Sequence, residues 1–247
     1  MSKIIAFANH KGGTGKTTTA VNVAAFLQQA GKQVLIIDLD PQSNISLCLG
    51  VEETAGGIYE ALRTGVLTAP TPYRSGGGID IIPSSLDLAA AEMELTAEAG
   101  REYILKELLS DARAKYDYIL LDCPPSLGLL TLNGLTAADI VIIPVQAEFL
   151  AVRGVTKITE IVNKVKRRLN TALKLAVIVT RYSPNKVLNR NVMESVQTTY
   201  KENYLGFIRE NIALAEASAT GKTIIDYSPK SAGASDYFQI TNKIMEL

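Results

Sequence analysis

The sequence lacks several residue types on which common protein sites depend. Its 247 residues include no tryptophan, one histidine (His10) and two cysteines, Cys48 and Cys123. Two unclustered thiols predict a reducing compartment, and they are too few soft ligands for a zinc or iron–sulfur site within one chain. A Ser-His-Asp hydrolase is disfavoured as well, because its base would have to be His10.

Long hydrophobic runs and net charge are also missing. No apolar stretch reaches the roughly 18–20 residues that cross a bilayer, and Lys11 interrupts the N-terminus too soon for a secretory signal. We therefore expect a soluble, cytoplasmic protein. With 25 basic and 25 acidic side chains, the chain is not a globally basic nucleic-acid binder. Residues 1–150 nevertheless hold 10 basic and 17 acidic side chains, whereas residues 151–247 hold 15 and 8.

What the sequence does contain is an alternation of short β-branched runs with longer segments of helical periodicity. At 47% hydrophobic and 20% charged residues, it can bury a full core. The alternation predicts the α/β class, with a doubly wound, mostly parallel sheet covered by helices on both faces, in one domain over residues 1–247. The expected strands are Lys3–Asn9, Gln33–Asp38, Ile79–Pro83, Tyr118–Asp122, Ile140–Val145, Leu175–Thr180 and Leu205–Arg209. The expected helices are Lys16–Ala30, capped by Gly31, then Ile58–Thr64, Arg101–Lys115, Leu127–Thr136, Val152–Leu169, Asn189–Glu202 and one from about Ser235; Ala69–Gly78 is expected to be a surface loop.

The most informative segment follows the first expected strand and opens the first expected helix. Residues 9–19 read Asn-His-Lys-Gly-Gly-Thr-Gly-Lys-Thr-Thr-Thr. Glycines there let backbone N–H groups converge on phosphate oxygens, Lys16 can reach the β- and γ-phosphates, and Thr17 can ligate Mg²⁺. The strict phosphate-loop pattern fails, because His10 occupies the first glycine position and a second lysine, Lys11, is present. We expect no chemical role for His10.

The doubled-lysine loop resembles the deviant Walker A motif of the ParA/MinD group of P-loop ATPases, and the chain is most similar to the ParA (Soj-type) partition ATPases. The similarity is strongest over residues 1–50 and 116–150. It implies ATP and Mg²⁺ as cofactors and a role for Lys11 at the nucleotide of a second subunit, so that ATP would control dimerisation. The nucleotide-binding residues that it implies in the loop are Lys11, Gly12, Gly13, Thr14, Gly15, Lys16, Thr17 and Thr18.

Two carboxylate-bearing segments fit this resemblance. Residues 34–42, Val-Leu-Ile-Ile-Asp-Leu-Asp-Pro-Gln, form an apolar strand whose carboxyl end carries two aspartates, where open α/β sheets bind ligands. In the family the second of these, Asp40 here, positions or activates the attacking water. Residues 118–125, Tyr-Ile-Leu-Leu-Asp-Cys-Pro-Pro, look like a Walker B strand and a switch segment. The implied catalytic residues are Lys11, Lys16 and Asp40, and the implied metal ligands are Thr17, Asp38 and Asp122.

The nucleotide base is predicted from a missing motif. GTPases read guanine with Asn-Lys-x-Asp, but none of the Asn-Lys pairs at 163, 185 and 242 is followed by that aspartate, which favours ATP. In the family the loop beside adenine usually reads Pro-Arg-Asn, and this chain has Arg-Glu-Asn at 209–211. The resemblance therefore implies that Asn211 binds adenine because it matches the motif, and that Arg209 does so because of its position.

The basic half contains a helix with two unlike faces. Residues 152–169 place apolar side chains on one face and basic side chains on the opposite face. This pattern is typical of a core helix whose outer face is solvated. The resemblance implies instead that the ATP-bound dimer binds DNA without sequence specificity. Arginines common in the family are missing after Asn211 and in residues 229–233. The candidate DNA-binding residues are Arg153, Lys157, Lys164, Arg167 and Arg168 on this helix, together with Lys186, Arg190 and Lys230.

Three classes of function follow from these patterns. The leading one is a DNA partition ATPase: its ATP-bound homodimer binds DNA on the nucleoid, and a ParB-type centromere-binding partner stimulates an otherwise slow hydrolysis. The second is a MinD-like ATPase on a membrane surface, but residues 237–247 contain one lysine and favour a helix docked on the core, so no stable membrane association is expected. The third resembles the nitrogenase iron protein, for which Cys48 and Cys123 are a poor match.

Overall fold

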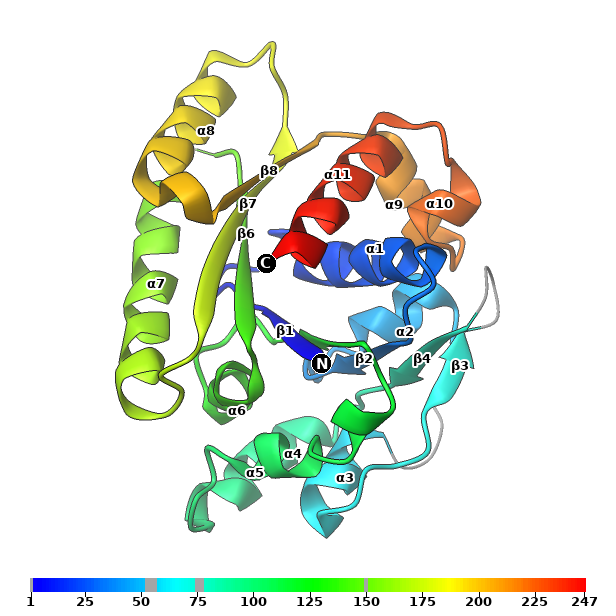
Figure 1. Cartoon of the computed structure of the whole chain (residues 1–247), viewed down its shortest axis with the longest axis vertical. Coiled ribbons are helices and arrows are strands. Elements are labelled where there is room, and N and C mark those ends of the chain that lie inside the picture. The colour runs from blue at the N-terminus through cyan, green and yellow to red at the C-terminus, as the bar shows by residue number, and fades with distance from the viewer. Residues whose placement is uncertain (1, 52–56, 74–77, 149–150) are drawn as a thin grey trace.

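A computed structural model describes residues 2–51, 57–73, 78–148 and 151–247, with the backbone alone for residues 151–153 (Figure 1). Its centre is an eight-stranded sheet in the order β3-β4-β2-β5-β1-β6-β7-β8. Every neighbouring pair is parallel except β3 and β4. The strands are β1 Lys3–Phe7, β2 Val34–Asp38, β3 Thr71–Tyr73, β4 Ile79–Ile82, β5 Tyr118–Asp122, β6 Ile140–Gln146, β7 Lys174–Tyr182 and β8 Tyr204–Arg209.

Helices cover both faces of this sheet (Figure 1). On one face lie α3 Ile58–Thr64, α4 Leu88–Glu94, α5 Ile104–Leu108, α6 Leu129–Ala137, α7 Ala151–Arg168 and α8 Val187–Tyr200. On the other lie α1 Lys16–Gln29, α2 Asn44–Leu49, α9 Ile212–Ala219, α10 Ile224–Tyr227 and α11 Ala232–Glu246. Short 3₁₀ turns occur at Leu95–Ala97, Ala112–Ala114 and Lys201–Asn203. The doubly wound α/β architecture is thus confirmed.

Each central strand supplies both cores. In β2, Leu35 and Ile37 pack into the core under α3–α8, whereas Val34 and Ile36 pack into the core under α1 and α11. Successive side chains of a strand point to opposite faces, so a strand covered on both sides is apolar throughout. No described helix is long and apolar enough to cross a membrane.

The seven expected strands are present, and the helix cap expected at Gly31 is confirmed. Gly31, at φ +78°, donates its N–H to Gln28 O while Lys32 donates to Leu27 O, the two bonds of a Schellman C-cap. The expectation of a surface loop at Ala69–Gly78 is wrong for Thr71–Tyr73, which form the antiparallel edge strand β3, and residues 74–77 of that loop lie outside the described residues.

Other helix expectations need correction. The single helix expected over Arg101–Lys115 is wrong: α5 and a separate 3₁₀ turn divide it near Ser110, where Ser and Asp side chains favour turns over helix. The helix expected over Asn189–Glu202 is shifted to Val187–Tyr200. The C-terminal helix begins at Ala232 rather than Ser235, because the Ser231 side chain accepts from Ala234 N and caps it. Four helices were not expected: α2, α4, α9 and α10.

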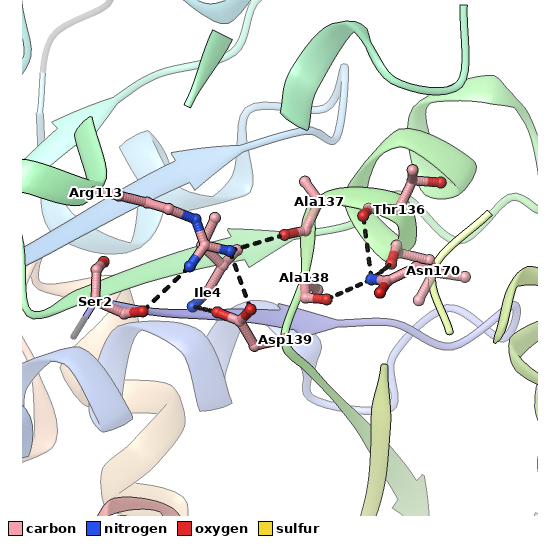
Figure 2. A network of polar contacts seen from close by, with 9 residues as sticks. Ser2, Ile4, Arg113, Thr136, Ala137, Ala138, Asp139 and Asn170 are labelled. Atoms are coloured by element: carbon pink, nitrogen blue, oxygen red, sulfur yellow. Dashed lines mark hydrogen bonds and ion pairs between the residues drawn. The ribbon is translucent and has the colours of Figure 1, made fainter. Parts of the chain in front are cut away.

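A polar network closes the edge of the sheet where the parallel strands begin (Figure 2). The Arg113 guanidinium donates to Asp139 Oδ1 at 3.0 Å and to Ser2 O at 3.2 Å. The other carboxylate oxygen, Asp139 Oδ2, accepts from Ile4 N at 2.7 Å and so fixes the start of β1. Beside it, Asn170 Nδ2 lies 2.7–3.2 Å from three carbonyl oxygens at the end of α6, those of Leu135, Thr136 and Ala138.

Replacing Asn170 with alanine removes the side chain that caps α6. The last carbonyls of a helix have no partner within it, and an unsatisfied buried acceptor costs about 1–3 kcal/mol. We expect Asn170→Ala to lower the free energy of unfolding by about 1–2 kcal/mol in urea denaturation. The exposed Asn185→Ala is the matched control and should leave it unchanged; equal stability of the two variants would contradict the capping role.

Candidate nucleotide site

The glycine-rich loop between β1 and α1 opens the first helix toward the carboxyl edge of the sheet. Gly13 and Gly15 adopt φ values of +73° and +88°, which favour glycine, and Gly15 precedes α1 without a side-chain cap. The first N–H groups of α1 are therefore available to an anion. Thr180, at the end of β7, donates to Thr14 O at 2.8 Å and anchors the loop.

Two aspartates lie side by side beneath this loop. Asp38 and Asp122 are register partners at the last positions of β2 and β5, and both are fully buried. Thr17 Oγ1 donates to Asp122 Oδ2 at 2.6 Å. Burial raises the pKa of Asp122 to about 7, although the Thr17 hydrogen bond and the charge of Lys16 oppose that rise. Burial, followed by the Asp122 charge, raises the pKa of Asp38 well above its usual range.

Asp38 also shapes the turn that carries Asp40. Its Oδ1 accepts from Asp40 N at 2.9 Å, and its Oδ2 accepts from Ile45 N at 3.0 Å. Asp40 is itself 5% exposed, and its Oδ1 accepts from Gln42 N at 3.1 Å. Both oxygens of Asp38 thus accept hydrogen bonds from backbone N–H groups, and these bonds fix the turn between β2 and α2. The expected role of Asp38 as a metal ligand stays a prediction.

The oxygen atoms at the Asp122 end of the site suit a magnesium ion. Asp122 Oδ1 is buried and has no hydrogen-bond partner among the described residues, and the hydroxyl of Thr17 lies beside the same carboxylate. Mg²⁺ prefers hard oxygen ligands and is held by one or two protein groups plus phosphates and water. No group of three or more His, Cys, Asp or Glu side chains that could hold a metal occurs in the described chain. The fit is therefore to a phosphate-bound ion rather than to a protein cage.

The two lysines of the loop lie in different surroundings. Lys16 is buried, 7% exposed, and acts electrostatically on Asp122. The Lys11 side chain is 44% exposed, and its Nζ lies 2.7 Å from Glu148 Oε2, itself half exposed. Lys16 is therefore directed into its own site, while Lys11 is held on the surface by a pair that solvent can reach.

His10 lies between the loop and α7. Its Nδ1 is buried without a partner in the described structure, and a Cβ on Gly154 of α7 would lie 3.4 Å from His10 Cε1. Burial, and then the charge of Lys157, lower the pKa of His10. The absence of a chemical role for His10 stays a prediction.

A cleft of about 610 Å³ extends from the loop. Its lining includes Gly13, Gly15, Thr18, Cys48, Thr180, Arg181, Ile208, Arg209, Glu210, Asn211, Ile212, Leu214, Ala215, Ser218 and Tyr237. Of the two cysteines, Cys48 is half-buried on this wall, while Cys123 is buried in the core. Apart from Arg209 and Asn211, no sequence motif indicated this wall, because β7, β8, α9 and α11 are distant in sequence from the phosphate loop.

Arg209 and Asn211 line the cleft but are already bonded within the chain. The Arg209 guanidinium binds Asp236, with Nη2 at 2.6 Å from Oδ1 and Nε at 2.9 Å from Oδ2. Asn211 Oδ1 accepts from Ala213 N at 2.9 Å and caps α9. Both side chains therefore fix the wall, and their contact with adenine stays a prediction.

The candidate DNA-binding residues do not form one patch. An exposed stripe on α7, defined here as Lys157, Lys164, Arg167 and Arg168, runs along an 18-residue helix of about 27 Å. The side chain of Arg153 lies outside the described residues. Lys186 is paired with Glu210 at 2.7 Å, and Arg190 donates to Pro184 O at 2.6 Å, both near the start of α8. Lys230 is exposed between α10 and α11, on the opposite face of the sheet.

Comparisons with known proteins agree with this geometry. Residues 2–175 match the family described as an AAA domain. The sporulation initiation inhibitor protein Soj of Bacillus subtilis is 41% identical over 99% of this chain and 98% of its own.

The chain belongs to the Soj/ParA family of partition ATPases.

Two solved structures extend the likeness to the whole fold. Cobyrinic acid a,c-diamide synthase of Mycobacterium smegmatis, bound to an ATP analogue and magnesium, superposes with a TM-score of 0.86 at 34% identity, covering all of this chain and 95% of its own. A Borrelia burgdorferi protein described as a plasmid partition protein, bound to AMPPNP, gives 0.83 at 29% identity and covers 100% and 99%. The P-loop ATPase fold expected from the Soj/ParA resemblance is confirmed.

The buried aspartate makes the ligand-free stability depend on pH. Folded Asp122 has a pKa of about 7 against its usual 3.8, so it binds a proton that the unfolded chain has lost between these values. The free energy of unfolding therefore falls as pH rises through that window. We expect Asp122→Asn, in EDTA and without nucleotide, to show a shallower fall than the wild type between about pH 5 and pH 7 in urea titrations. The exposed Asp111→Asn should keep the wild-type slope; equal slopes in all three proteins would contradict the assignment.

Proposed function

We propose that this protein is an ATP-dependent DNA partition ATPase. It binds Mg-ATP, dimerises around the nucleotide, binds DNA without sequence specificity and is released after hydrolysis stimulated by a ParB-type partner. Membership of the Soj/ParA family supports the activity. The observation that carries the proposal is the contrast between a buried Lys16 at Asp122 and an exposed Lys11 in the same loop.

Within one subunit, the chain's own residues position the triphosphate. The N–H groups of the loop and the Lys16 ammonium bind phosphate oxygens, and Thr17 with Asp122 holds the ion. Bound Mg²⁺ supplies charge neutralisation at the phosphates. Asp40, fixed by Asp38 at the end of β2, orients water for attack. Phosphoryl transfer requires this positioning rather than a covalent intermediate.

Lys11 supplies the step that a single subunit lacks. Its pair with Glu148 is exposed on both sides, and such pairs contribute about 0–1 kcal/mol, so another anion can replace Glu148 at little cost. The phosphates of a second subunit's nucleotide are such an anion. A lysine that crosses the interface would act like an arginine finger supplied in trans, and dimerisation would then depend on ATP.

The basic stripe of α7 is the best-supported DNA surface. Its apolar side is fixed in the core, with Val155, Ile158 and Val162 buried, so the cations project into solvent. A dimer would present this stripe twice. Lys186 contributes less than its sequence position suggests, since Glu210 neutralises it.

A membrane-surface function is disfavoured by the C-terminal helix. Tyr237, Ile240 and Ile244 of α11 are at most 2% exposed and pack on the sheet with α1. The apolar side that a membrane anchor would need is therefore already buried in the core, as we expected from the sequence.

The decisive measurement is DNA binding in three nucleotide states. Fluorescence anisotropy with a nonspecific duplex should show tight binding with Mg-ATP and weak binding with ADP or no nucleotide.

Asp40→Ala should keep ATP-dependent binding but lower hydrolysis by at least about tenfold, because water is no longer oriented. Lys11→Ala should retain ATP binding yet lose the ATP-dependent dimer in light scattering. Lys16→Ala is the control for loss of nucleotide binding itself. DNA affinity that ignores nucleotide state would contradict the proposed function.

The stripe on α7 predicts a specific salt effect. Affinity for DNA falls as salt rises, and each phosphate contact makes the slope of log affinity against log salt steeper by about 0.9. We expect the double variant Lys164→Ala/Arg167→Ala to make that slope shallower by about 2–4 for a dimer, while ATP-dependent dimerisation stays intact. Lys222→Ala, an exposed cation on the other face of the sheet, is the control and should keep the wild-type slope. An unchanged slope in the double variant would place DNA elsewhere.

A further inference from the structure

Two neighbouring residues of the phosphate loop contact the segment that joins β6 to α7. Lys11 Nζ lies 2.7 Å from Glu148 Oε2, just beyond the end of β6. The His10 ring lies against Gly154 at the start of α7, where a Cβ would be 3.4 Å from His10 Cε1. We call Glu148 and Gly154 the β6–α7 junction. Consecutive side chains of the loop thus contact both sides of this junction.

The residue before His10 is fixed independently of the junction. Asn9 is 4% exposed, and its Nδ2 donates to Pro144 O of β6 at 2.7 Å. Asn9 Oδ1 accepts from Lys11 N at 3.1 Å. The start of the loop is therefore held on β6 by a buried side chain, so the side chains of His10 and Lys11 are the ones that can exchange partners.

Both contacts are weak in the ligand-free chain, for different reasons. The pair of Lys11 and Glu148 is exposed on both sides, so solvent screens it. The Nδ1 atom of His10 is buried and has no hydrogen-bond partner among the described residues. A buried polar atom without a partner costs free energy, so a movement that gives this nitrogen a partner or exposes it to water is favoured. The ligand-free junction is therefore biased toward change.

The His10 ring also lies close to the basic stripe of α7. Burial and then the charge of Lys157, the first residue of that stripe, lower the pKa of His10. Lys157 follows Gly154 by three residues, so both lie on the same side of the helix. Val155 and Ile158 are buried in the core between them. Because closely packed elements move as units, a displacement at Gly154 shifts this part of α7 rather than one side chain.

We infer that His10 is a positioning residue that transmits the exchange of Lys11, from Glu148 to a nucleotide, onto the start of α7. This role needs no proton transfer and no contact with phosphate, so it is compatible with the absence of a chemical role for His10. The contact with Gly154 stands on the geometry, while its link to ATP rests on the function proposed for Lys11. The coupling is reciprocal, so a ligand that binds the shifted α7 raises the affinity for ATP by the same factor.

Hydrogen exchange of the full chain, with Mg-ATP and with ADP, tests the coupling. In the wild type, exchange of the α7 amides after Gly154 should differ between the two nucleotides. His10→Ala should lose that difference but keep nucleotide binding and the ATP-dependent dimer, because Lys11 and the rest of the loop are intact. His10→Phe keeps a ring against Gly154 and removes the unpartnered nitrogen. It should keep the difference but require severalfold more ATP for half-maximal dimerisation, because the ligand-free arrangement is no longer penalised.

A steric change from the other side of the contact gives the opposite shift. Gly154→Leu presses on the His10 ring in the ligand-free chain, so it should lower severalfold the ATP concentration for half-maximal dimerisation. In the His10→Ala background the same change should have no effect, because the ring is gone. Gly154→Ala, whose Cβ only reaches contact distance, is the matched control and should behave as the wild type does. Asn163→Leu adds the same bulk on the exposed side of α7 and should also change nothing.

The outcomes separate this coupling from the proposed function. An exchange difference in α7 that persists in His10→Ala, or that is absent in the wild type, overturns the coupling. An effect of Gly154→Leu that is the same with and without the ring also overturns it. A merely structural role of His10 would lower the urea midpoint and the nucleotide affinity together and leave the α7 difference in place. All of these measurements are made without DNA, so the coupling can fail while nucleotide-dependent DNA binding holds, and the reverse.

Discussion

Two carboxylates buried side by side at the ends of β2 and β5 are the constraint on which the site depends. Register pairing brings Asp38 and Asp122 together, and burial disfavours their charged forms. Among the described residues, the groups that offset that cost are the ammonium of Lys16, the hydroxyl of Thr17 and two backbone N–H groups. The ligand-free site is therefore electrostatically incomplete, and a phosphate-bound divalent cation is the group that completes it.

Several distant contacts hold this arrangement in place. Thr180 ties the phosphate loop to β7, and Asp38 ties the turn after β2 to α2. Behind Asp122, Cys123 is buried, and a Cβ at Gly134 would lie 2.9 Å from its sulfur. Glycine in the middle of α6 is unfavourable for the helix but lets α6 pack directly on the end of β5. The chemistry of a few residues thus depends on close packing of elements far apart in sequence.

The predictable parts of the fold are those with a local cause. Strands buried on both faces are recognisable as apolar runs, and the loop of residues 9–19 is recognisable because phosphate binding needs glycines and lysine at fixed spacing. Tertiary contacts decided the rest. Thr71–Tyr73, which contains Pro72, resembles a loop and becomes a strand only because β4 has a free edge. The cleft wall combines β7, β8, α9 and α11, and no local sequence pattern predicts that Asp236 binds Arg209.

The balance of 25 acidic and 25 basic residues excludes a globally basic nucleic-acid binder, but the fold separates those charges in space. One helical layer carries both the basic stripe of α7 and α4, which lies in a segment, residues 78–100, with five acidic and no basic side chains; the two helices lie apart along the sheet (Figure 1). A polyanion such as DNA is attracted to the first and repelled by the second. A neutral net charge is therefore compatible with an anionic partner, provided that this partner meets the α7 side of the layer.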